Sequence, residues 1–137
     1  MKEARGIRNC NPLNIRKGAQ WQGMREVQTD PSFVQFKTMQ YGIRAAFKLM
    51  RNHITGFGGS RPCRNTLAKL INVWAPPSEN ATQRYVDFVS HSVGLGAWDI
   101  INPDDAPTMC RIARAMAFFE TGQWLDADLF ASSWFII

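Results

Sequence analysis

The chain has 137 residues, of which 45% are hydrophobic and 20% charged, a composition typical of one globular domain spanning residues 1–137 with a real core. Its formal net charge of +5 indicates an anionic partner such as nucleic acid, an anionic membrane surface or an acidic wall polymer, unless the charge serves only solubility. No apolar run reaches the length of a transmembrane helix, and the polar N-terminus MKEARGIRNCNP contains no signal-peptide core.

The chain offers no recognisable metal or cofactor motif. Cys10, Cys63 and Cys110 are widely spaced without a CxxC pair, and their odd number argues against a complete disulfide framework. Three reduced thiols are favoured over one bridge and a free thiol. His53 and His91 each stand late in a predicted helix without a metal-binding motif, so both are interpreted as surface or core residues. We therefore expect no metal and no cofactor.

Residues 5–36 are predicted to be irregular or strand-like. Asn, Pro and Gly are frequent at the start of this segment, and Pro12 excludes a helix interior there. Two short extended pieces fit best, at Gln20–Gln28 and Phe33–Phe36, with a turn at residues 29–32 between them.

Helical periodicity begins at Thr38 and continues through most of the remaining chain. The tail Leu125–Ile137 is apolar and is expected to dock on the core as a short helix or an added strand. The whole pattern predicts a mainly helical α+β domain. The expected helices run from Thr38 to before Gly56, from Asn65 or Thr66 to Trp74, where Pro76-Pro77 follows, from Ser78 or Asn80 to about Ser92, and from about Ala106 to Thr121.

The last of these helices is predicted to carry a carboxylate on its apolar side. At about 100° per residue, Glu120 lies about 180° from Arg111 and on the same side as Ala113 and Met116. Burial of a carboxylate is costly and raises its pKa, which suits a general acid. The alternative is that Glu120 sits in a frayed last turn and reaches water.

Few other carboxylates compete for a catalytic role. Glu26 falls in a strand-like segment and could face a cleft, so it is the second catalytic candidate. Asp30 is interpreted as a turn residue, although the second carboxylate of a glycosidase could stand in such a region. Glu79 is expected in the first turn of a helix, where it complements the helix dipole.

Three segments together resemble one known family. They are RGIRNCNPLNIR at residues 5–16 followed by Trp21-Gln22-Gly23, then FVQF…YGIRA at residues 33–45, and WAPPSENAT…YV at residues 74–86. The first is similar to the RGIRNNNPxNIR…WxG signature of phage and bacterial lysozyme-like murein hydrolases, which are often labelled virion lytic proteins. The others resemble the FxxF…GIRA and WAPPxENxTxxYI blocks of that family. Cys10 departs from the pattern, because the family usually has Asn there.

The resemblance implies a lysozyme-like fold and cleavage of peptidoglycan between N-acetylmuramic acid and N-acetylglucosamine. In lysozyme-like transglycosylases the catalytic Glu ends a helix, and a loop resembling residues 11–15 follows it. Here that loop lies at the N-terminus, and the helix-ending glutamate is Glu120. We therefore hypothesise a circularly permuted arrangement, in which the N-terminal loop packs beside Glu120.

Two reaction outcomes are open at this point. With Glu120 as the only acid and base, a lytic transglycosylase would close the sugar's own 6-hydroxyl on the anomeric carbon; in a muramidase, Glu26 or Asp30 would assist water. The transglycosylase is preferred slightly on the number of acids. Six residues are candidates for substrate binding, with ordinary turn or core roles as the alternative: Asn11, Asn14, Gln28, Tyr41, Trp74 and Tyr85.

Two further functional classes remain open. One is a non-catalytic wall-binding or virion structural module, which predicts an exposed or salt-bridged Glu120 with no cleft before it. The other is a nucleic-acid binder, which the scattered arginines disfavour. We expect peptidoglycan as the partner and no nucleic acid. The protein is expected to be made in the cytoplasm and to reach the wall through a phage particle, lysis or a secretion system, where an immunity protein could accompany it.

Overall fold

A computed structural model describes residues 3–75 and 79–137. Within these residues the chain is mainly helical. Three long helices, α2, α4 and α5, carry most of the fold, and shorter helices complete it. In chain order the helices are α1 (Arg5–Arg8), α2 (Met39–Gly59), α3 (Leu67–Trp74), α4 (Glu79–Val93), α5 (Ala106–Thr121) and α6 (Ala127–Phe135).

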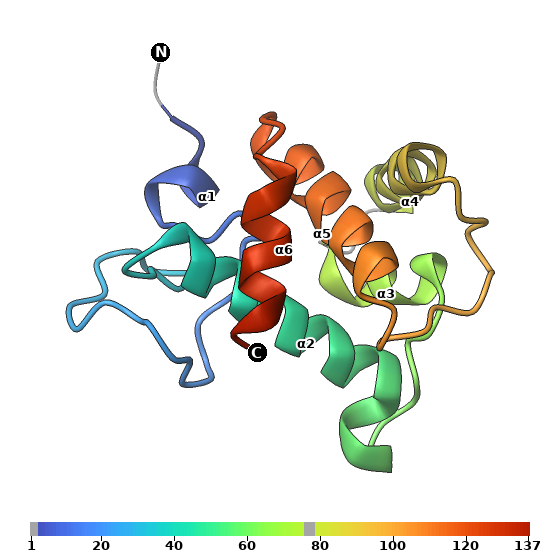
Figure 1. Ribbon diagram of the computed structural model, residues 1–137, viewed down its shortest axis with the longest axis horizontal. Coiled ribbons are helices and arrows are strands. Elements are labelled where there is room, and N and C mark those ends of the chain that lie inside the picture. The colour runs from blue at the N-terminus through green and yellow to red at the C-terminus, as the bar shows by residue number, and fades with distance from the viewer. Residues whose placement is uncertain (1–2, 76–78) are drawn as a thin grey trace.

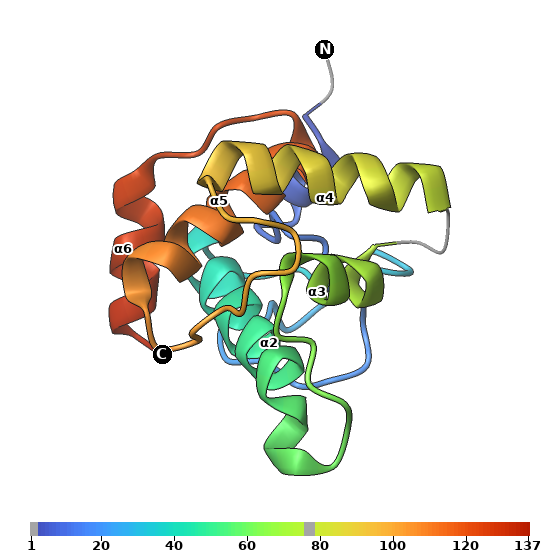
Figure 2. The same cartoon turned by 90° about the vertical axis from the view of Figure 1, so that its right-hand side faces the viewer.

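Helix α5 lies at the centre of the helical part. It contacts α4 on one side and α2 and α6 on others, while α3 packs against α4 and α2. Figure 1 shows α6 in front of α2 and beside α5, and Figure 2 shows α4 lying above α3 and α2. The irregular N-terminal segment occupies the side of α2 away from α4 (Figure 1), and α1 reaches α5 from there.

The helix boundaries follow from local capping chemistry. The side chains of Thr38, Thr66, Asp105 and Asp126 each accept a hydrogen bond from a backbone N–H of the first turn that follows. Gly122 ends α5 in the left-handed conformation, with φ of 76°. The helix expected over residues 106–121 is confirmed at both ends, and the one expected from residue 65 or 66 to 74 begins one or two residues later. The helix expected to stop before Gly56 extends to Gly59, although Gly56, Phe57 and Gly58 have left-handed backbone. The expected Pro76-Pro77 stop and the Ser78 cap lie outside the described residues.

The core joins the helices to the N-terminal segment. Leu13, Val34 and Phe36 come from the irregular part and are fully buried, as are Ile43, Met50, Leu70, Ile112, Met116 and Phe130 from the helices. Burial of a side chain of this size contributes about 1.5–3 kcal/mol. The apolar tail docks as helix α6, the first of the two forms expected for it, because Phe130 inserts fully into the core.

The N-terminal segment differs from the sequence prediction. The two expected strands do not form; residues 3–75 and 79–137 contain only isolated bridges, such as Arg16 with Phe33 and Met24 with Phe36. A short helix, α1, stands at Arg5–Arg8. Val34 and Phe36 are both buried and Gln35 between them is 8% exposed, so this piece is buried on both sides rather than half-buried. Side-chain hydrogen bonds replace a regular sheet ladder here.

Candidate functional site

Glu120 stands in the last turn of α5, where the helix meets the N-terminal segment. It is partly buried, on the side of α5 opposite the exposed Arg111, as its angular position predicts. Burial raises the pKa of Glu120 above its ordinary value of 4.5, while hydrogen bonds from Asn14 and Tyr85 and the charge of Arg16 act in the opposite direction. Glu120 is therefore a carboxyl group held in place, with its neutral form favoured by its surroundings.

Asn14 links the N-terminal loop to this carboxyl group. Its Nδ2 donates to Oε1 of Glu120 at 2.8 Å, across 106 residues of sequence. Asn14 adopts a left-handed backbone with φ of 53°, which asparagine tolerates better than most residues. Its Oδ1 is buried and has no hydrogen-bond partner among the described residues. The expected packing of the N-terminal loop beside Glu120 is thus present in the fold.

Gly6 in α1 allows this approach. A Cβ atom at Gly6 would lie 3.1 Å from Oδ1 of Asn14, 3.2 Å from Cγ2 of Thr121 and 2.9 Å from the carbonyl oxygen of Asn11. A side chain at position 6 would therefore push α1 away from the end of α5.

Tyr85 closes the other side of the glutamate. It is 2% exposed, its ring stacks on Phe119 at 4.1 Å between centroids, and its hydroxyl donates to the carbonyl oxygen of Met116 at 3.4 Å while facing Glu120. Burial and the charge of Glu120 raise the pKa of Tyr85 well above its ordinary value of 10.0, so the phenol remains a hydrogen-bond donor. Tyr85 can thus orient the carboxyl group and keep water from one side of it.

A hollow opens beside Asn14, and we call it the first hollow. It has a volume of about 200 Å³ and lies between the N-terminal loop, α2 and α3. Trp74, at the end of α3, lines it and is fixed by a hydrogen bond of 2.8 Å from its indole Nε1 to the carbonyl oxygen of Leu13. The lining consists of Asn14, Ile15, Arg16, Ala19, Trp21, Leu49, His53, Val73 and Trp74. Arg16 connects the hollow to Glu120, because its charge acts on that carboxyl group.

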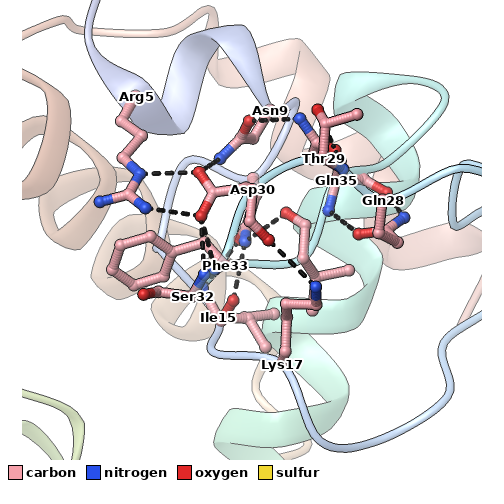
Figure 3. Close-up of polar contacts among 12 residues, drawn as sticks. Arg5, Asn9, Ile15, Lys17, Gln28, Thr29, Asp30, Ser32, Phe33 and Gln35 are labelled. Atoms are coloured by element: carbon pink, nitrogen blue, oxygen red, sulfur yellow. Dashed lines mark hydrogen bonds and ion pairs between the residues drawn. The ribbon is translucent and has the colours of Figure 1, made fainter.

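Asp30 has a structural role. Arg5 binds both of its oxygens, at 2.7 and 2.6 Å, and Asn9 donates at 2.9 Å. The backbone N–H groups of Ser32 and Phe33 donate to the same carboxylate, as Figure 3 shows. These contacts, the Arg5 hydrogen bonds first, hold the pKa of Asp30 well below its ordinary value of 3.8. Because these contacts occupy its oxygens, they support the interpretation of Asp30 as a structural turn residue, and its assistance to water stays an untested prediction.

Asn11 and Gln28 are also occupied by the backbone. Asn11 is fully buried and bridges the backbone of Ile15 and Val34 through three hydrogen bonds. Gln28 exchanges hydrogen bonds with the backbone of Gln35 and also donates to the carbonyl oxygen of Arg25 (Figure 3 shows the Gln28 pairing). Both residues shape the N-terminal segment, and substrate contact by either of them stays an untested prediction.

The remaining candidates lie apart from Glu120. Glu26 is exposed in the loop before Asp30 and makes no hydrogen bond or ion pair with any residue in the described ranges. It therefore has nothing to orient it toward the site. Tyr41, in the first turn of α2, packs its ring against Gly23, where a Cβ atom would overlap it. Tyr41 does not line the first hollow.

Two residues of this region were not predicted from the sequence as site residues. Arg16 follows Asn14 by two positions, and that proximity to a candidate residue was its only signal. His53 was interpreted as a surface or core residue, yet it lines the first hollow with its ring 6.2 Å from that of Trp74. No periodicity distinguishes it from the other residues of its helix face.

Neither a metal-binding cluster nor a membrane-spanning helix is found in the part of the chain that the structure describes. Within it, no group of three His, Cys, Asp or Glu side chains stands close enough to hold a metal ion. None of its helices is both long enough and apolar enough to span a bilayer. The three cysteines are free thiols.

Comparison with known proteins gives the chain a relative. No family model matches it. It is 37% identical over 123 residues to Protein P5 of Pseudoalteromonas phage PM2, and the match covers 87% of this chain and 72% of that protein. Identity at this level over most of both chains shows common descent, so the chain belongs to the same family as this phage protein.

Proposed function

We propose that this protein cleaves the glycan strands of peptidoglycan between N-acetylmuramic acid and N-acetylglucosamine, with Glu120 as general acid. The observation that carries the proposal is the hydrogen bond of 2.8 Å from Asn14 to Glu120 beside the first hollow. It links a carboxyl group with a raised pKa, through Asn14, to a cleft lined by Trp74 and by polar groups, although Glu120 itself is not among the lining residues. A glycosidic oxygen leaves readily only when it is protonated, and Glu120 would supply that proton.

The same carboxylate would then act as base. Neither Glu26 nor Asp30 is among the groups that shift the pKa of Glu120, and Asp30 is bound by Arg5. An acid without a second carboxylate favours attack by the sugar's own 6-hydroxyl, whose proton returns to Glu120 as the new carbon–oxygen bond forms. The expected product is a 1,6-anhydro sugar, and the protein would be a lytic transglycosylase.

The proposal includes a lysozyme-like fold in circularly permuted order. The supporting observation is that the loop at residues 11–15, which resembles the one following the catalytic helix in lysozyme-like transglycosylases, packs at the end of the last long helix. Membership in a family with a phage protein supports delivery to the wall by a phage particle or during lysis.

The test is digestion of purified peptidoglycan, with the released fragments analysed by mass spectrometry. Wild-type protein should release fragments with anhydro ends, and Glu120→Gln should reduce release by at least about a hundredfold because general acid catalysis contributes about 10²–10⁴-fold. Glu26→Gln is the matched control and should retain activity. Reducing ends instead of anhydro ends would assign a muramidase, and undiminished release by Glu120→Gln would refute the role of Glu120.

A non-catalytic wall-binding module is the second candidate, favoured by the basic net charge of +5. It would sediment with peptidoglycan and release nothing. Against it stands Glu120, which is partly buried and makes neither of the two ion pairs found among the described residues.

A further inference from the structure

A second hollow adjoins the first and has a different character. It has a volume of about 170 Å³ and is lined by His53, Phe57, Arg61, Pro62, Arg64 and Val73. His53 of α2 and Val73 of α3 line both hollows, so the two adjoin there, and we call the pair the groove. Asn14, which donates a hydrogen bond to Glu120, lines the first hollow, and a pair of arginines lines the second.

The second hollow is positively charged. Neither Arg61 nor Arg64 takes part in an ion pair within the described residues, where the pairs are Arg5 with Asp30 and Arg51 with Asp104. None of its lining residues is acidic. Both arginines act on the ring of His53, and together with burial they lower its pKa below the ordinary value of 6.5. Two unneutralised guanidinium groups at a concave surface suit a carboxylate or phosphate ligand.

The backbone holds this arrangement in place. The end of α2 turns through left-handed residues, including Phe57 with φ of 52°, a conformation that costs a non-glycine residue about 1–2 kcal/mol. The turn places the Phe57 ring edge-on to His53 and beneath the Arg61 guanidinium, at 4.3 Å from the ring centroid. The backbone N–H of Arg64 donates to the carbonyl oxygen of His53 at 2.8 Å. The arginines are thus preorganised rather than trailing in solvent.

We propose that the second hollow is a subsite for a carboxylate of the peptide stem carried by the peptidoglycan substrate, bound by Arg61 and Arg64. The proposal rests on the proposed function, because it takes the groove as the site of a glycan strand. Every muramic acid unit can carry such a stem, and the stem ends in a free carboxylate. The groove would place that group at the arginines while the sugar lies at Trp74, so the protein would prefer glycan that still carries peptides.

Binding of two soluble muropeptides tests this directly. One is the N-acetylglucosaminyl–N-acetylmuramic acid disaccharide bearing a tetrapeptide, and the other is the same disaccharide without peptide; neither contains the bond that is cleaved. Calorimetry should show the peptide-bearing form binding at least about tenfold tighter to wild-type protein, the size of one charge-assisted hydrogen bond. The preference should weaken as salt is added.

The variant for this test is Arg61→Gln combined with Arg64→Gln. It should lose the preference while binding the peptide-free disaccharide as wild type does. Arg111→Gln, an exposed change of the same charge on the far side of α5, is the matched control and should keep the preference. Arg64→Lys keeps the positive charge and should keep the preference for the peptide-bearing form. If all variants also melt at the wild-type temperature, the loss in the double variant comes from lost charge and not from lost structure. In NMR spectra, the ring signals of Phe57, which lines the second hollow but not the first, should shift with the peptide-bearing ligand only.

Three results would overturn the proposal. The first is equal affinity of wild-type protein for both muropeptides, and the second is a loss of affinity for both muropeptides in the double variant. The third is an arginine-dependent preference for glycerol phosphate oligomers, which would identify a phosphate polymer as the ligand of the second hollow. The outcome is separable from that of the proposed function. Catalysis by Glu120 is read from Glu120→Gln on peptidoglycan, whereas the peptide preference is read from binding alone.

Discussion

Glu120 combines its proposed functional role with a cost in folding stability, because its carboxyl group is partly buried. Its carboxyl group is partly buried at the end of α5, and its raised pKa means that the folded state binds the proton more tightly than the unfolded chain does. The associated stability is therefore fully present below the ordinary pKa of 4.5 and is lost as the pH rises through the raised value.

Glu120→Gln should accordingly stabilise the protein at neutral pH while removing the proposed glycan-cleaving activity. Gln has nearly the same shape and keeps an oxygen acceptor for Asn14, but it carries no charge to desolvate. Thermal melting should show a higher Tm for the variant at about pH 7, with the difference vanishing well below the ordinary Glu pKa. Glu26→Gln, at an exposed position, should show no such dependence. A difference that is constant with pH would mean that the Glu120 carboxylate is solvated.

At Cys10, the backbone conformation decides how a substitution affects stability. Its φ of 52° lies in the left-handed region, which asparagine tolerates better than cysteine. We expect Cys10→Asn to raise the free energy of unfolding by up to about 1 kcal/mol, measured by urea denaturation. Cys63→Asn is the control, because Cys63 is exposed and does not have a positive φ. Equal effects of the two changes would contradict the backbone explanation.

Among the elements, α2 is placed by its close approach to the N-terminal loop. Gly42 is buried at the contact, and a Cβ atom there would overlap the carbonyl oxygen of Cys10. Because backbone cannot yield as a flexible side chain does, α2 can dock only if position 42 has no side chain. The docking also fixes the loop that carries Asn14 to Glu120.

Gly42→Ala should therefore destabilise the protein by about 3 kcal/mol, although alanine is the better helix former by about 1 kcal/mol. Urea denaturation measures the change. Lys48→Ala on the same helix, whose side chain is only partly buried, should change stability by less than about 0.5 kcal/mol. If Gly42→Ala proved stabilising, helix propensity would outweigh the steric contact, and the close packing of α2 would be refuted.

At the scale of the whole molecule, one ion pair joins α1 to the turn at residues 29–32. Asp30 is 8% exposed, and its lowered pKa means that it stabilises the fold above its ordinary pKa of 3.8, with the stabilisation lost as the pH falls through the lowered value. Among the described residues, the N-terminal segment forms only isolated bridges and no sheet. The hydrogen bonds of Asp30 with Arg5 and Asn9 therefore hold this segment together instead.

Asp30→Asn should lower the urea midpoint at neutral pH, and the difference from wild type should narrow as the pH falls below 3.8. Loss of order in the N-terminal segment should also reduce activity, because Asn14 would no longer be held at Glu120. Asp104→Asn is the control: Asp104 pairs with Arg51 but its side chain is 78% exposed, so its removal should have little effect at any pH. Equal sensitivity of the two variants would contradict a structural role for Asp30.

The sequence by itself predicted helices α2 to α5 and the position of Glu120 on α5, whereas α1 was not predicted and the tail that forms α6 was left open between a helix and a strand. Residues 106–121 carry their own signals, with Asp105 and Pro107 at the start and Gly122 at the end, and such capping acts within one turn of the chain. The opposition of Glu120 to Arg111 follows from helical geometry alone. No contact with another segment is needed for either conclusion.

Only the tertiary structure decided which polar side chains serve the fold and which face the site. Asn11 and Asn14 are three residues apart in one loop. The side chain of Asn11 forms hydrogen bonds with the backbone, whereas that of Asn14 donates to Glu120. The apparent strands at residues 20–36 are replaced by the Asp30 and Gln35 networks, whose partners lie about 20 residues or more away in Arg5 and Asn9. Such contacts depend on which distant segments the fold brings together, and the local residue pattern does not predict those segments.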